Sequence, residues 1–149
     1  MIKLDDALVG VQHLGLDTAP FIYFVERNPG YVNLVREVVR RISTGALRGH
    51  TSVITLTEVL VQPLRLGQTA LAQRYRRFLS RSQNLSLEAI TAGAAEQAAE
   101  LRARYGLRTP DALQIAAALG AGCTALLTND VQLQRVAEIR VLVLDELEL

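Results

Sequence analysis

The strongest constraint on the fold is the alternation of short apolar runs with longer amphipathic segments along the whole chain. The short runs are rich in Leu, Val and Ile and are bounded by turn residues, which is typical of buried strands; we expect them over 11–17, 50–54, 85–90, 124–128 and 140–144. The segments between them favour helices, expected over 19–26, 31–42, 55–64, 68–82, 91–105, 109–120 and 131–138. Such alternation predicts an α/β fold: a three-layer α/β/α sandwich with a mostly parallel sheet of about five strands, 140–144 being an edge strand.

The length and composition fit one domain spanning 1–149. Half of the 149 residues are hydrophobic and few are aromatic, which suits helices packed on an aliphatic sheet. Cys123 is the only cysteine, so the chain has no internal disulfide and no thiolate pair for a metal, and a reducing compartment is expected. The first residues lack the basic-then-apolar order of a signal peptide, and no apolar stretch is long enough to cross a bilayer. We therefore expect a cytoplasmic protein with no membrane partner. The net charge of +1 says little about other partners.

Four acidic residues occupy corresponding places in this pattern. Asp17 ends the first expected strand, Glu58 lies in the helix after the second, Asp111 opens the helix before the fourth, and Asp130 follows the fourth. In open parallel sheets, ligands bind outside the carboxyl ends of the strands, near the point where the strand order reverses. We expect all four acids at that one edge of the sheet.

Each acid also has an ordinary structural interpretation as a helix-start residue. Thr55 and Glu58 match a capping box, Thr109-Pro110-Asp111 is a common helix opening, and Asp17 or Thr18 and Asn129 or Asp130 could cap the helices that follow them. Four converging carboxylates, however, would repel one another without a cation, and hard oxygen ligands suit Mg²⁺ or Mn²⁺. The two histidines, His13 and His50, are expected at the core edge or the surface.

Four segments carrying these acids resemble the signature segments of PIN-domain nucleases. They are LGLDTAPFIYFVE, TSVITLTEVL, LRTPDALQIAAAL and LLTND, and they are above all similar to those of the VapC-type toxins of toxin–antitoxin systems. The resemblance implies that Asp17, Glu58, Asp111 and Asp130 are the catalytic acids and bind one or two Mg²⁺ ions, for which Mn²⁺ could substitute. Thr18, Thr128 and Asn129 would be supporting polar groups, while Glu26 lies in a similar segment without an assigned role.

The same resemblance implies an endoribonuclease that hydrolyses RNA phosphodiester bonds with metal-activated water. It also implies a small cognate antitoxin bound in a groove near the helical hairpin around Gly67, and a homodimer. Asp17 comes later in the chain than the first acid of VapC-type proteins usually does, so residues 1–10 are interpreted as a possible N-terminal extension.

Specific residues argue against two other α/β families. Response-regulator receivers and haloacid-dehalogenase-type phosphatases need a lysine late in the chain, and the only lysine is Lys3; the phosphatases also need an aspartate where Ala19 stands. A non-catalytic PIN domain that binds RNA or a protein stays open as an alternative. Arg74, Arg77 and Arg81 share one helix face, which could contact an RNA backbone or could simply be solvated.

Overall fold

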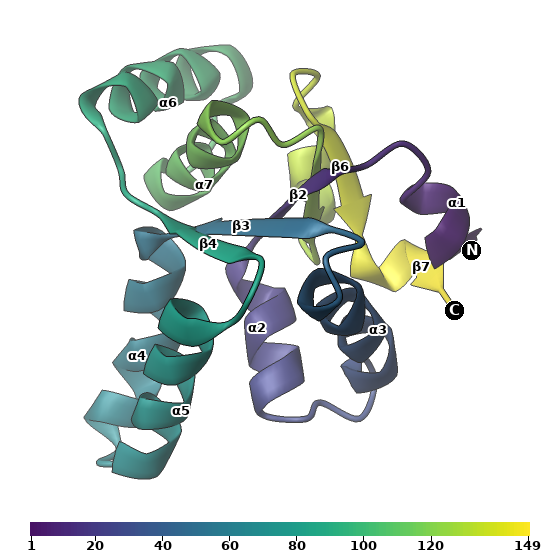
Figure 1. Cartoon of the computed structure of the whole chain (residues 1–149). Helices are drawn as coiled ribbons and strands as arrows, with labels where there is room; N and C mark the ends of the chain where they lie inside the picture. Colours follow the sequence, from purple (N-terminus) through teal and green to yellow (C-terminus); the bar gives the residue numbers. More distant parts are fainter.

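The computed structural model describes all residues, 1–149, and its main sheet has five parallel strands (Figure 1). The strand order is β4-β3-β2-β5-β6, where β2 is His13–Leu16, β3 Arg48–Ser52, β4 Leu85–Glu88, β5 Ala125–Thr128 and β6 Arg140–Val143. Every neighbouring pair in this order is parallel. The predicted α/β class is confirmed, and 140–144 is an edge strand as expected.

Helices cover both faces of this sheet. In Figure 1, α6 (Ala92–Tyr105) and α7 (Thr109–Gly120) lie above it, while α2 (Thr18–Val25) and α3 (Val32–Ser43) lie below it. The antiparallel pair α4 (Val53–Arg65) and α5 (Thr69–Arg81) projects at the lower left. None of these helices has the length and apolar character needed to cross a bilayer.

The strand pleat divides the interior into two apolar clusters. Leu14, Leu16 and Leu127 belong to a cluster of 21 buried residues on the α2/α3 side, and Leu126 belongs to one of 12 on the α6/α7 side. Gly15 points toward α7, where an added Cβ would lie 2.9 Å from the Cβ of Ala118. The missing side chain therefore lets α7 pack closely on the central strand.

The path of the chain places a topological switch point beside β2. From β2 the chain adds β3 and β4 on one side and then returns to place β5 and β6 on the other. The Asp17 amide extends the β2–β5 pairing by donating to the Leu127 carbonyl at 2.9 Å. The carboxyl ends of β2 and β5 thus form the crevice in which such sheets bind ligands.

Several predicted boundaries differ from the structure; the strands predicted over 11–17 and 85–90, for example, are the shorter His13–Leu16 and Leu85–Glu88. The strand predicted over 50–54 ends at Ser52, because the Ser52 hydroxyl accepts a hydrogen bond from the Ile54 amide and begins α4 at Val53. The helix predicted over 131–138 is a 3₁₀ helix, η1, of only five residues, Val131–Arg135. At Ser52 a local capping bond sets a boundary that hydrophobic spacing does not define.

The terminal segments form structure that the sequence did not predict. Strand β1 (Ile2–Lys3) pairs in parallel with β7 (Leu147–Glu148) in a separate two-stranded sheet. A one-turn helix, α1 (Leu4–Ala7), follows β1, and a 3₁₀ turn, η2 (Leu144–Glu146), precedes β7. Leu4, Ala7 and Leu8 are buried in the larger apolar cluster, so these three residues of the N-terminal segment are part of the core packing.

Candidate active site

Asp17 lies at the switch point, directly after β2, and caps helix α2. One carboxylate oxygen, Oδ1, accepts from the Thr18 amide at 2.9 Å, and the other, Oδ2, accepts from the Thr128 hydroxyl at 2.8 Å. Capping explains part of its position, because the first amides of a helix need acceptors. The second oxygen reaches across to β5, which a cap alone does not require.

The electrostatic environment of Asp17 disfavours its charge. Burial is the main reason that the pKa of Asp17 is raised, and the negative charges of Asp111 and Glu58 raise it further. The hydrogen bonds from Thr128 and Thr18 act in the opposite direction. Asp111 and Glu58 therefore lie within electrostatic reach of Asp17.

Gln114 is a buried member of this site that the sequence analysis missed. Its side-chain amide donates to Thr55 Oγ1 at 2.7 Å and reaches Asp17 Oδ1 at 3.3 Å, and its carbonyl oxygen accepts from the Ser52 hydroxyl at 2.5 Å. Gln114 is one helical turn after Asp111 on α7, the spacing that places two residues on one face. A lone polar residue inside the apolar run DALQIAAAL is the signal that could have identified it.

Glu58 lies in α4 and contacts the start of α2. It accepts a hydrogen bond of 2.5 Å from the Thr18 hydroxyl. The capping-box interpretation of Thr55 and Glu58 is wrong, because Ser52 caps α4 and Thr55 is buried one turn inside it. Glu58 is an exposed residue, and its carboxylate is engaged with Thr18 rather than with the start of its own helix.

Asp111 is in the first turn of α7, where its carboxylate is paired with Arg108. The Arg108 Nε donates to Asp111 Oδ2 at 3.1 Å; the arginine side chain is 75% exposed and that of the aspartate 14%. The pKa of Arg108 is raised mainly by this hydrogen bond, and the charges of Asp130 and Glu58 contribute to the increase. One guanidinium therefore lies within the electrostatic reach of three of the four acids.

Thr128 connects Asp17 to Asp130 across the ends of β2 and β5. Its hydroxyl donates to Asp17 and accepts from the Asp130 amide at 3.1 Å. The Asp130 carboxylate caps η1 by accepting from the Gln132 amide at 3.0 Å. The side chain of Asn129 contacts Tyr23 and the Asp145 amide and none of the four acids.

The composition of the site fits a hard cation, although its side chains are engaged with protein donors. Its groups are carboxylate, hydroxyl and amide oxygens, which suit Mg²⁺ or Mn²⁺. No three Asp, Glu, His or Cys side chains stand in an arrangement that could hold a metal ion. Glu58 is turned to Thr18, Asp111 to Arg108 and Asp130 to its own helix, so ligation would require these carboxylates to exchange partners.

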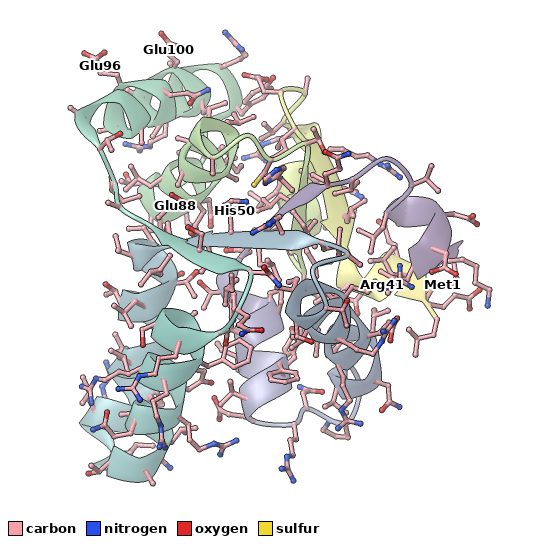
Figure 2. The ribbon with its side chains drawn as sticks, viewed as in Figure 1. Met1, Arg41, His50, Glu88, Glu96 and Glu100 are labelled. Atoms are coloured by element: carbon pink, nitrogen blue, oxygen red, sulfur yellow. The ribbon has the colours of Figure 1, made fainter.

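Three other residues singled out in the sequence lie away from this edge. Glu26 is at the opposite end of α2 from Asp17, about 13 Å along the helix axis at 1.5 Å per residue, and accepts from the Tyr75 hydroxyl. His13 and His50 lie on adjacent strands, with Nδ1 of His13 2.9 Å from Nε2 of His50. The Nδ1 atom of His50 in turn lies 2.9 Å from Glu88 Oε1, and Figure 2 shows His50 and Glu88 close together at the strands.

Solved structures with this fold come from toxin–antitoxin complexes. The chain is similar to one in the DNA-bound VapBC2 complex of Rickettsia felis, with a TM-score of 0.68 and 19% identity over 89% of this chain and 98% of that one. For a Klebsiella pneumoniae toxin–antitoxin complex the TM-score is 0.68, with 23% identity over 88% and 97% of the two chains. For VapBC-5 of Mycobacterium tuberculosis it is 0.58, with 19% identity over 88% and 98%. At these identities the likeness establishes the fold.

The family of the chain is identified from its sequence. No curated protein matches it. The PIN domain family model matches residues 15–139, a range that contains Asp17, Glu58, Asp111 and Asp130. The match covers most of the chain and agrees with the parallel sheet and its switch point: the chain belongs to the PIN domain family.

Proposed function

We propose that this PIN domain is a Mg²⁺-dependent endoribonuclease that hydrolyses phosphodiester bonds in RNA. The observation that carries the proposal is Asp17, a carboxylate held at the switch point by donors on both oxygens while Asp111 and Glu58 oppose its ionisation. Such accumulated negative charge is unfavourable in isolation and favourable around a divalent cation. PIN domains are a family of nucleases, which supports the same conclusion.

Asp17, Glu58, Asp111 and Asp130 are the residues that would hold the metal, with Mn²⁺ as a possible substitute. Bound there, Mg²⁺ would supply Lewis-acid activation of water and neutralise the charge that develops on phosphorus. Thr128, the Thr18 amide and Gln114 orient the Asp17 carboxylate, and the Thr18 hydroxyl orients Glu58. The exposed guanidinium of Arg108 is suited to meet a phosphate, because its fork of donors matches phosphate oxygens.

An RNA cleavage assay tests the proposal. Single-stranded RNA is incubated with the protein in Mg²⁺, in Mn²⁺ and in EDTA, and the Asp17→Asn variant is compared with Glu96→Gln, an acid on the outer side of α6 (Figure 2). Cleavage should need the divalent ion and fall at least about 100-fold in Asp17→Asn, which matches the several kcal/mol that metal-ion catalysis supplies. Glu96→Gln should cleave normally. Cleavage that persists in EDTA or in Asp17→Asn contradicts the mechanism.

A non-catalytic PIN scaffold is the second candidate function. The observation that favours it is that no three acidic side chains stand in a metal-holding arrangement. In that case the protein would bind RNA or a protein without cleaving RNA. Binding without any metal-dependent cleavage, for RNA of several sequences, would support this candidate.

The partners are inferred from the same relationship. Chains similar to this one occur in toxin–antitoxin complexes, which supports a toxin that is neutralised by a small antitoxin. Val61, Leu64 and Leu66 are exposed apolar residues on α4 and the turn after it, which supports a contact surface on this hairpin for the antitoxin or for a second copy in a homodimer.

Two experiments test these partners. Expression of this protein should arrest growth, and co-expression of a small protein encoded beside its gene should relieve the arrest. Light scattering measures the oligomeric state. A cytoplasmic location stays a prediction.

A further inference from the structure

Arg108 contacts one of the four acids from the connection between α6 and α7. Its guanidinium reaches both oxygens of the Asp111 carboxylate, with Nε 3.1 Å from Oδ2 and Nη2 3.4 Å from Oδ1. Its remaining donor groups make no hydrogen bond within the chain. The arginines that the sequence singled out lie elsewhere, because they line a groove with Arg27 and Arg36; they are Arg74, Arg77 and Arg81. The arginine at the acids is therefore Arg108.

The place of Arg108 in the fold is unfavourable for an arginine. It is the N-cap residue of α7, a position that favours Ser, Thr, Asp and Asn because their side chains accept from the first amides of the helix. Arg108 provides no such cap, and the helix dipole disfavours a positive charge at this end. Local helix chemistry therefore does not explain the residue, whereas its contact with Asp111 can.

The backbone before Arg108 is held in place, whereas its side chain is exposed. Leu107 is buried, and its carbonyl accepts from the Arg102 Nε at 2.9 Å. The Arg108 side chain is 75% exposed. A side chain of this kind can change its partner without any change in the fold around it.

The hydrogen bonds between Arg108 and Asp111 are longer than those of a comparable pair. Arg40 and Glu37 on α3 have the same three-residue separation, and their two hydrogen bonds of 2.9 and 2.7 Å lie in the usual range for charged partners. Both bonds of Arg108 exceed that range. Exposed ion pairs also contribute little to stability, so another cation can replace this guanidinium at small cost.

The charge of Arg108 acts on three acids. The pKa of Arg108 is raised mainly by Asp111 and further by Asp130 and Glu58. The Asp111 carboxylate is turned to Arg108, and no three acidic side chains stand around a common metal position. The guanidinium thus supplies positive charge where neighbouring carboxylates would otherwise repel one another.

We propose that Arg108 exchanges partners: it pairs with Asp111 in the metal-free protein and moves to a backbone phosphate of the RNA when a divalent cation takes that carboxylate. The proposal rests on the proposed function. A guanidinium fork matches carboxylate and phosphate oxygens alike, so one side chain can serve both partners. Metal binding frees the fork, and a bound phosphate keeps it away from Asp111. Metal and RNA therefore each increase the affinity for the other.

The first test measures metal affinity in the absence of RNA. The electron paramagnetic resonance signal of free Mn²⁺ gives the affinity of the wild type, Arg108→Gln, Arg108→Lys and the control Arg40→Gln. The control removes another exposed arginine that pairs with an acid three residues away, on α3. Circular dichroism confirms that all variants fold.

Arg108→Gln should bind Mn²⁺ at least about fivefold more tightly than the wild type, the lower end of the usual coupling between two sites. A purely structural role would not produce such a gain. Arg40→Gln should change the affinity less than about twofold, and Arg108→Lys, which keeps the charge, should lie between the wild type and Arg108→Gln. Unchanged or weaker Mn²⁺ binding by Arg108→Gln overturns the proposal. Equal affinities of the Gln and Lys variants also overturn it, because the charge then does not compete with the metal.

The second test measures cleavage of single-stranded RNA at saturating Mn²⁺. Arg108→Gln should lose at least about tenfold in kcat/KM, because the phosphate loses a charged hydrogen-bond donor, and Arg40→Gln should cleave like the wild type. An unchanged kcat/KM of Arg108→Gln overturns the contact with phosphate.

The two tests together distinguish this proposal from the proposed function. If the wild type cleaves no RNA while Arg108→Gln gains affinity for Mn²⁺, the nuclease proposal fails and the competition at Asp111 stands. If the wild type cleaves RNA while Arg108→Gln binds Mn²⁺ no more tightly, the nuclease proposal stands and the exchange of partners is wrong.

Discussion

Asp17 combines two requirements that oppose each other at the level of a single residue. As the cap of α2 and the acceptor for Thr128 it stabilises the end of β2. As a partly buried carboxylate near Asp111 and Glu58 it is costly to ionise, which is why its pKa is raised. Carboxylates with such opposed requirements are typical of functional sites.

Replacing Asp17 with Asn should therefore stabilise the protein at neutral pH in EDTA. The folded pKa of Asp17 lies above its ordinary value of 3.8, so wild-type stability falls as pH rises from that value through the folded pKa, while the variant has no such dependence. We expect a gain of about 0.5–2 kcal/mol at neutral pH, the usual range for a stabilising substitution, and a smaller gain near pH 4. Urea unfolding at both pH values measures it. Equal or lower stability of the variant at neutral pH would show that the hydrogen bonds outweigh the desolvation.

Gln114 should matter to both stability and cleavage. In Gln114→Met the Ser52 hydroxyl loses its acceptor, and Asp17 and Thr55 lose a donor, inside a buried network. We expect the free energy of unfolding to fall by about 1–3 kcal/mol, the usual cost of leaving a buried polar group unpaired, together with a reduced kcat. Gln97→Met on α6, where the amide makes no hydrogen bond within the chain, is the matched control and should change neither quantity appreciably.

At the level of elements, helix α7 packs closely on the central strand β2 because Gly15 has no side chain. Gly15 lets α7 lie close to β2, and α7 carries both Asp111 and Gln114 toward the site. Three strands are also linked on this face by the contacts of His13 with His50 and of His50 with Glu88. The geometry of the site therefore depends on how α7 packs on the sheet.

Gly15→Ala should destabilise the protein by about 1–3 kcal/mol, the usual cost of overpacking a core. The new methyl group would meet Ala118 on α7 at 2.9 Å, and moving α7 displaces Asp111 and Gln114, so cleavage should fall as well. The new methyl group of Gly93→Ala on α6 would make only an ordinary van der Waals contact with Thr91 Oγ1 at 3.8 Å. This variant should instead be stabilised by about 0.5–1 kcal/mol, because alanine favours a helix over glycine. Thermal unfolding of both variants distinguishes packing from a general effect of the added methyl group.

The Glu88 contact should give a defined pH dependence. The hydrogen bond from His50 lowers the pKa of Glu88 below its ordinary value of 4.5, so its contribution is present above that value and is lost as pH falls through the folded pKa. Glu88→Gln should therefore be less stable than the wild type at neutral pH, and the difference should shrink as pH falls below 4.5. A difference that stays constant across this range would mean that the charge of Glu88 does not contribute.

At the scale of the whole molecule, the two ends of the chain complete one side of the fold. Strands β1 and β7 pair, and the Lys3 ammonium reaches Glu148 at 3.5 Å and the Leu149 carbonyl at 2.8 Å. Behind this small sheet Leu4 is only 1% exposed and belongs to the larger apolar cluster. The buried residues of the N-terminal segment thus support the same core as α2 and α3.

Truncating Leu4 tests this role. Leu4→Ala should lower the free energy of unfolding by about 2–5 kcal/mol, the usual cost of removing a buried leucine side chain. Val9→Ala, with a 71% exposed side chain in the same segment, should have little effect. Denaturation of the two variants in parallel measures the difference; similar, small effects would mean that the terminal segment packs only loosely.

The sequence predicts the main sheet, its helices and the edge that carries the four acids, because these depend on local periodicity and on residues next to strand ends. It does not predict β1 and β7, since two-residue strands have little periodicity and their pairing joins positions 145 residues apart. Gln114 was missed because its role comes from contacts with Asp17 and Ser52, distant in the chain. Grooves such as that of Arg27 and Arg36 with α5 likewise exist only after three helices have packed.

The central position of β2 has a consequence for protein synthesis. Strand β2 is the first strand of the main sheet to be made, but β5, which supplies Thr128 and leads to Asp130, lies more than 100 residues later. In a chain emerging from the ribosome, Asp17 therefore lacks Thr128 and Asp130 beside it until residue 130 has left the ribosome. If the protein cleaves RNA, incomplete chains are inactive, and the ribosome and messenger that produce them are protected until translation is nearly finished.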